Sequence, residues 1–171
     1  NTSFKGYRYD NDIYDGLYWA LKKYEDPLTK SLDGHENNIR AMVTRKASKH
    51  IYTAGGEGKI LRWSYDNTGW KSEDLVGGRE NRLITSMAVS PDENWMIVGG
   101  NFNSSNPDAN FVELYDLRNI GSGAKQIQGF KGEVGDLIFA TDSKGFYARD
   151  NEGYSVRYCD LSTVKEVIAS K

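Results

Sequence analysis

Three stretches of this chain share one pattern, and this repeat constrains the fold more than any single residue does. Each stretch holds three short runs of strand-forming residues separated by turns. The runs are 39–43, 50–54 and 60–66, then 84–89, 95–99 and 111–117, then 134–139, 145–148 and 155–161. From Ile39 to Ile84 is 45 residues, and from Ile84 to Val134 is 50. Repeats of about 40–45 residues with four strands each are typical of β-propeller blades.

The chain is therefore predicted to be an all-β protein of four-stranded antiparallel propeller blades. We expect a fourth strand after each set of three, at 70–76, 124–128 and 164–169. The predicted blades are 36–76, 82–128 and 132–169, within a propeller domain at 28–171. Glycine and other turn-forming residues at 55–58 and 150–153 suit tight hairpins between the second and third strands.

An additional strand is expected at 28–32, with no set of three strands before it. Such a strand suits the closure of a propeller ring. Three blades are fewer than the usual number of about four to eight. We therefore expect either missing downstream blades or a second copy of the chain that supplies them, since open blade faces favour association.

Residues 1–27 are predicted to form a separate N-terminal segment with one amphipathic helix at 10–24. Ile13, Leu17, Ala20, Leu21 and Tyr24 recur at helical spacing. Pro27 ends the segment. Several Asp residues on the helix argue against membrane binding, which favours a basic polar face.

Composition excludes several classes of function. The 171 residues carry 22 Lys and Arg against 24 Asp and Glu, a net charge of −2. A nucleic-acid binder needs a concentrated basic face, and no apolar run is long enough to span a bilayer. Cys159 is the single cysteine, so an internal disulfide is excluded, which favours the cytoplasm. Residue 1 is Asn, so the chain is processed, trimmed or cut, and a periplasmic or surface form stays open.

Several blocks resemble the WD40 repeat family. The block 32–40, with Gly34-His35, is similar to the start of such a repeat, and 51–63 is similar to its central hairpin ending in Trp63. Ser90-Pro91-Asp92 is similar to the turn after the first strand. The resemblance covers 28–171. The helix and propeller together also resemble WD40 regions of some bacterial multidomain proteins, several of which act in signalling.

The resemblance implies a buried structural hydrogen-bond set of His35, Thr53 and Trp63. An Asp that the family places in the following turn falls here on Gly56 or Glu57. Blades two and three depart further from the pattern, with Gly77-Gly78 and Tyr115, and with Gly129-Phe130 and Tyr158, in place of Gly-His and Trp. These are degenerate repeats, which keep the fold without the polar set.

We expect no catalytic residues, no cofactor and no metal. His35, His50 and Cys159 are too few and too scattered for zinc, which needs three or four ligands. The loop 101–110 holds a single acidic residue, Asp108, which is too little for calcium. No Ser, His and Asp set and no pair of carboxylates has a local sequence spacing that indicates a catalytic site.

The leading hypothesis is a non-catalytic protein–protein interaction scaffold, as part of a larger multidomain protein. The resemblance implies that partners bind where the first strand of each blade begins. The candidate partner residues are Asn38, Arg40, Leu83, Thr85, Glu133 and Gly135. Two alternatives stay open. One is a propeller enzyme or small-ligand binder with its site at the central channel, and the other is a purely architectural half-propeller in a receptor or signalling chain.

Overall fold

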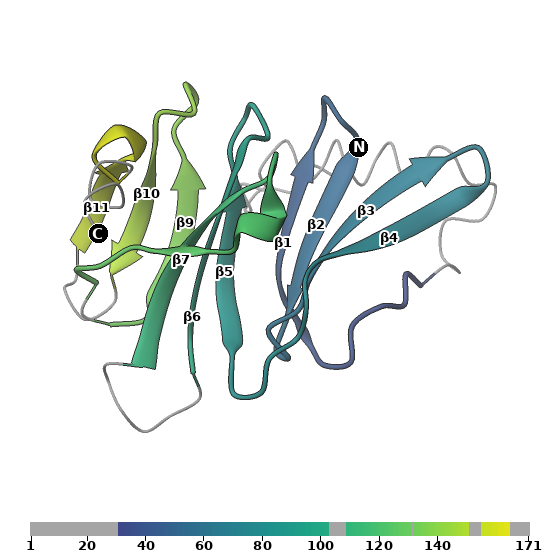
Figure 1. The fold of residues 1–171 in the computed structure, drawn as a ribbon, viewed down its shortest axis with the longest axis horizontal. Coiled ribbons are helices and arrows are strands. Elements are labelled where there is room, and N and C mark those ends of the chain that lie inside the picture. The colour runs from purple at the N-terminus through teal and green to yellow at the C-terminus, as the bar shows by residue number, and fades with distance from the viewer. Residues whose placement is uncertain (1–30, 103–108, 131, 151–154, 165–171) are drawn as a thin grey trace, which may run out of the picture.

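A computed structural model describes residues 31–102, 109–130, 132–150 and 155–164. The chain folds into three antiparallel sheets that stand side by side, in chain order from right to left in Figure 1. This confirms the predicted all-β fold of propeller blades. The helix expected at 10–24 lies outside the described residues.

Blade one is a four-stranded sheet in the order β1-β2-β3-β4. Its strands are β1 (Ile39–Arg45), β2 (His50–Gly55), β3 (Ile60–Asp66) and β4 (Gly69–Val76). The β2–β3 turn places Gly58 at φ 75°, a left-handed conformation that a residue without Cβ adopts without strain. The predicted strand at 70–76 is thus confirmed as β4.

Blade two has the order β5-β6-β7-β8. Its strands are β5 (Leu83–Val89), β6 (Trp95–Asn101), β7 (Asn110–Asp116) and β8 (Lys125–Gln126), with the 3-10 helix η2 (Ile120–Ser122) before β8. The fourth strand is shorter than the predicted 124–128. Gly123 and Gly129, which have φ of 81° and 97°, lie just outside the predicted range, and the Ile127 N–H still donates to the Val112 carbonyl oxygen at 2.8 Å.

Blade three has three described strands, in the order β11-β10-β9. They are β9 (Val134–Phe139), β10 (Gly145–Asp150) and β11 (Ser155–Asp160). The fourth strand predicted at 164–169 is wrong at Val164, because residues 161–164 form a helical turn. The Asp160 carboxylate accepts a hydrogen bond from the Ser162 N–H at 2.8 Å, as an N-cap does. Residues 165–169 lie outside the described residues.

The closing strand predicted at 28–32 is wrong in its described part, since residues 31–32 are not in a strand. The Ser31 hydroxyl donates a hydrogen bond to Asp33 at 3.3 Å. Local side-chain bonds of this kind compete with strand pairing. Residues 28–30, most of the loop predicted at 101–110 and the turn residues 151–153 lie outside the described residues.

Blade two is buried on both faces. Alternate residues of β6 point in opposite directions, so that Met96 and Val98 pack toward blade one while Trp95 and Ile97 pack toward blade three. The same alternation along β7 points its odd-numbered residues, from Phe111 to Tyr115, toward blade one. Two apolar layers thus join the three sheets into one body.

The first strands of the blades, β1, β5 and β9, are neighbours in space. Their starting residues therefore meet on one face of the molecule, which we call the strand-start face. Among the described residues, no helix is long and apolar enough to cross a membrane.

Candidate functional site

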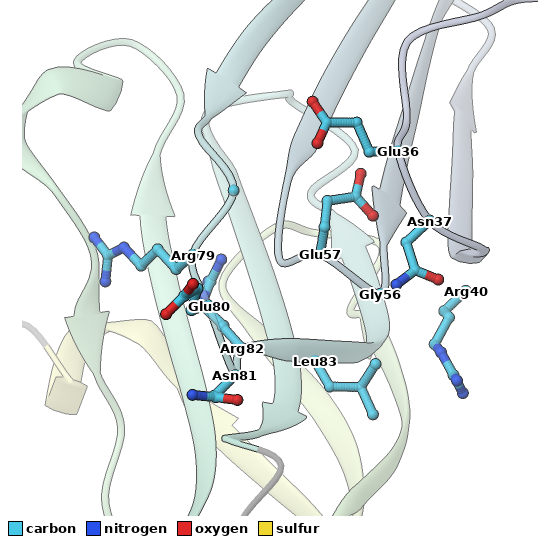
Figure 2. A pocket seen from close by; sticks show the side chains of 11 residues that line it. Glu36, Asn37, Arg40, Gly56, Glu57, Arg79, Glu80, Asn81, Arg82 and Leu83 are labelled. Carbon is cyan, nitrogen blue, oxygen red and sulfur yellow. The ribbon is translucent and has the colours of Figure 1, made fainter.

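The strand-start face carries two hollows. The first has a volume of about 720 Å³ and lies where blade one meets the segment leading into blade two. Figure 2 shows Arg40 on one rim of this hollow and Arg79 on the opposite rim. Its remaining lining comes from the segments 36–37, 56–57, 78 and 80–83.

The second hollow, of about 650 Å³, lies across all three blades. It is lined by Asn38, Ile39 and Arg40 at the start of β1, by Thr85 in β5, and by Glu133 just before β9. Arg40 borders both hollows. Ile39 is 52% exposed, so an apolar side chain stands between the charges of this hollow.

The structure brings together most of the candidate partner residues. Asn38, Arg40, Thr85 and Glu133 line the second hollow, and Leu83 lines the first. Gly135 lines neither of them. Its Cα is covered by Arg149, since a Cβ added there would lie 2.3 Å from an Arg149 guanidinium nitrogen.

Behind this face, blade one holds a buried polar cluster that we call the His35 cluster, made of His35, Thr53, Glu57 and Trp63. His35 Nε2 lies 2.7 Å from Thr53 Oγ1, and Trp63 Nε1 donates to the same oxygen at 2.8 Å. His35 Nδ1 lies 2.6 Å from Glu57 Oε1. With a neutral imidazole protonated at Nδ1, Trp63 donates to Thr53, Thr53 to His35 and His35 to Glu57.

The order carboxylate, imidazole and hydroxyl in the His35 cluster is that of a nucleophilic triad. Its surroundings differ from those of an active site. The His35 side chain is 4% exposed and Thr53 is 5% exposed. The Thr53 oxygen already accepts the Trp63 N–H, so the hydroxyl faces protein groups and not a substrate channel.

Blade two holds a second polar cluster, the Arg82 cluster, made of Arg82, Glu113 and Tyr115. The Arg82 side chain is 0% exposed and forms an ion pair with Glu113. Arg82 also donates to the Tyr115 hydroxyl at 2.9 Å, and Tyr115 donates to Glu113 at 2.7 Å. A further bond of 2.7 Å from Arg82 to the carbonyl oxygen of Gly58 ties the cluster to blade one.

Two tyrosines near the blade-one and blade-two contact have shifted acidities. Burial, followed by the charge of Glu93, raises the pKa of Tyr52 to about 12. Burial raises the pKa of Tyr115 well above its usual range, and the hydrogen bond to Glu113 adds to the shift. Both phenols are therefore held in their neutral form.

Other titratable candidates give no reactive site in the described part of the chain. Burial raises the pKa of the Cys159 thiol, which disfavours the reactive thiolate. His50 Nδ1 lies 3.2 Å from Glu93, to which the Tyr52 hydroxyl also donates. No group of three or more potential metal ligands occurs within residues 31–102, 109–130, 132–150 and 155–164.

Two parts of the site were missed by the sequence reasoning. Glu57 stayed undecided as the acidic member, because the position of the family's Asp falls on either Gly56 or Glu57. The Arg82 cluster was not predicted at all. The sequence feature that could have revealed it is Glu113, a carboxylate between Val112 and Leu114 in an apolar strand. A buried charge of this kind requires a partner.

Comparisons with known proteins agree with this architecture. No family model matches the chain. Topless-related protein 1 of Arabidopsis thaliana is 26% identical over 142 residues, which are 81% of this chain and 12% of that protein. The chain therefore spans only a small part of this relative.

Three solved structures superpose on 78% of this chain. The WD40 β-propeller domain of Doa1 gives a TM-score of 0.58 at 18% identity and is covered over 40% of its length. U3-55K and the RRP9 WD40 repeats both give 0.59 at 17% identity, covered over 39% and 38%. At such low identity the likeness shows the fold: the three sheets are blades of a WD40-type β-propeller.

Proposed function

We propose that this chain is a protein–protein interaction module whose partner binds on the strand-start face. One observation carries the proposal: Asn38, Arg40, Thr85 and Glu133, from three different blades, line a single hollow of about 650 Å³. Rigid sheets hold these side chains at fixed spacing, which lowers the entropy cost of binding. The WD40 fold in general mediates protein interactions, which supports the same role.

A non-catalytic role is part of the proposal. The His35 cluster stabilises blade one, and its buried hydroxyl supports this role over a catalytic one. No observation in the described residues favours a channel enzyme. We further propose that the module acts within a larger multidomain protein, and the 12% coverage of the plant relative supports this.

The test is charge reversal at Arg40. A photo-crosslinking residue at Asn38 would first identify the partner, and the purified partner would then be titrated by calorimetry. Arg40→Glu is expected to weaken binding by about tenfold or more, because it replaces an attractive interfacial contact with a repulsive one, and a cost of about 1.4 kcal/mol is already tenfold in affinity. Its melting temperature should stay unchanged, since Arg40 is exposed.

The matched control is Lys71→Glu on β4, in an exposed pair with Asp66 away from both hollows. It makes the same charge change and should leave binding intact. Equal binding by Arg40→Glu and the wild-type chain would overturn the proposal. Equal weakening by both variants would also do so, because the effect would then come from net charge alone.

A further inference from the structure

Several exposed charges outside the two hollows are paired within the molecule. Arg62 lies 2.5 Å from Glu73, and Arg118 lies 2.6 Å from Asp116. Lys71–Asp66 and Arg149–Asp136 form similar pairs. A partner that approached these residues would have to compete with an existing ion pair.

The charges that border the two hollows differ. Among the described residues, no ion pair involves Glu36, Arg40, Arg79, Glu80 or Glu133. Glu36, Arg40, Arg79 and Glu80 are also exposed. The hollows therefore present charges that are free to pair with a ligand.

The signs of these charges follow an order. Arg40 borders both hollows, with the acidic Glu36 and Glu80 in the first and Glu133 in the second. A ligand that crosses from Glu36 or Glu80 in the first hollow to Glu133 in the second thus meets an acid, then a base, then an acid. Arg79 lies on the rim of the first hollow opposite Arg40 (Figure 2). Leu83 and the exposed Ile39 add apolar contact between the charges.

We propose that the partner segment is an extended peptide with the complementary order, a carboxylate between two basic side chains. Its carboxylate pairs with Arg40 in the bidentate geometry that guanidinium favours. One basic side chain pairs with Glu133, and the other with Glu36 or Glu80. The volumes of about 720 and 650 Å³ accommodate several side chains each. This inference rests on the function proposed above.

The test uses fluorescein-labelled synthetic peptides of equal length with Gly and Ser spacers. One carries the order Lys, Glu, Lys, a second the inverted order Glu, Lys, Glu, a third only Lys and a fourth only Glu. Fluorescence polarisation at low ionic strength measures binding, since salt screens exposed pairs over about 10 Å at 0.1 M. The Lys, Glu, Lys peptide is expected to bind about tenfold tighter than each of the others.

Arg40→Glu should remove this preference, and Lys71→Glu should preserve it. Equal binding of all four peptides, or binding of the all-Lys peptide as tight as that of the alternating one, would overturn the inference. If those results came while Arg40→Glu still weakened the natural partner, the docking face would stand and only its charge pattern would be wrong. If Arg40→Glu affected neither ligand, both proposals would fail.

Discussion

Blade one and blade two each place a buried polar cluster beside their third strand, but they use different chemistry. The His35 cluster joins an imidazole, a hydroxyl and an indole through short hydrogen bonds within one blade. The Arg82 cluster joins a guanidinium to a carboxylate and reaches across to the Gly58 carbonyl oxygen of blade one. The first cluster thus lies within one blade and holds a carboxylate without a guanidinium partner, whereas the second pairs a carboxylate with a guanidinium and reaches between blades.

Because of this difference, the two clusters should lose different amounts of stability when one member is replaced. Loss of a neutral hydrogen-bond partner leaves one unpaired group, at a cost of about 1–3 kcal/mol. Loss of one member of a buried ion pair leaves an uncompensated charge, at about 3–5 kcal/mol. Blade two should therefore depend on its cluster more strongly than blade one does, and its failure should also loosen the contact between the blades.

The largest effect is expected from Arg82→Met. The variant leaves the Glu113 carboxylate buried without its cation and the Gly58 carbonyl without its donor. We expect a loss of about 3–5 kcal/mol in the free energy of unfolding, measured by urea denaturation.

The control is the double variant Arg82→Met with Glu113→Leu, which removes the orphan charge as well. It should recover at least half of the loss, because an apolar pair of similar volume replaces a buried ion pair with little penalty. A double variant as unstable as the single one would show that packing, and not charge, makes Arg82 important.

The two clusters also differ in what the sequence revealed about them. His35, Thr53 and Trp63 were predicted as a set because the resemblance of this blade to a WD40 repeat implies it. The Arg82 cluster depends on how one sheet packs on the next, through Arg82 and Glu113, which are 31 positions apart. The sequence shows Glu113 as an anomaly in an apolar strand without indicating its partner.

For the fold too, features set by the local sequence were predictable, and features set by contacts between segments were less predictable. The strand positions of the three blades follow from local alternation and turn residues, and most were predictable. The ends of the outer strands were harder to predict. The length of β8 depends on how far it pairs with β7, and the turn at 161–164 depends on capping by Asp160. Both are choices between conformations that similar residues allow.

An intermediate effect is expected from high pH, through a tyrosine at the blade-one and blade-two contact. The pKa of Tyr52 is about 12 in the fold, against about 10 in an unfolded chain. Because folding raises this pKa, its stabilising contribution is complete below pH 10 and is lost as pH rises toward 12. The loss is on the order of 2 kcal/mol.

Comparison of the wild-type chain with Tyr52→Phe isolates this effect from other titrating groups. Urea denaturation between pH 9 and 12 should give a steeper decline for the wild type. The Tyr115→Phe variant extends the comparison to the Arg82 cluster, since burial raises the pKa of Tyr115 still further above its usual range. Parallel curves for Tyr52→Phe and the wild type would show that Tyr52 ionises equally in the folded and unfolded states.

The smallest effect is expected from Glu57→Gln, which is compared with the same substitution in the Arg82 cluster. Glu57→Gln keeps an oxygen that can accept a hydrogen bond from His35 Nδ1, the nitrogen that lies 2.6 Å from Glu57 Oε1. The other carboxylate oxygen, Oε2, is buried with no hydrogen bond to a described residue, so the amide that replaces it gives up no existing bond. We expect a loss of about 1 kcal/mol or less in the free energy of unfolding.

Glu113→Gln makes the same change beside a fixed charge, the buried guanidinium of Arg82. This variant should lose about 3 kcal/mol or more, because a buried cation is left without its counter-charge. Each variant replaces one carboxylate oxygen with an amide group. The difference between their losses in the free energy of unfolding therefore reports whether the partner of the carboxylate is charged. An equally large loss for Glu57→Gln would mean that His35 carries a positive charge in the fold, and the distinction between a cluster without a cation and a cluster with one would then be wrong.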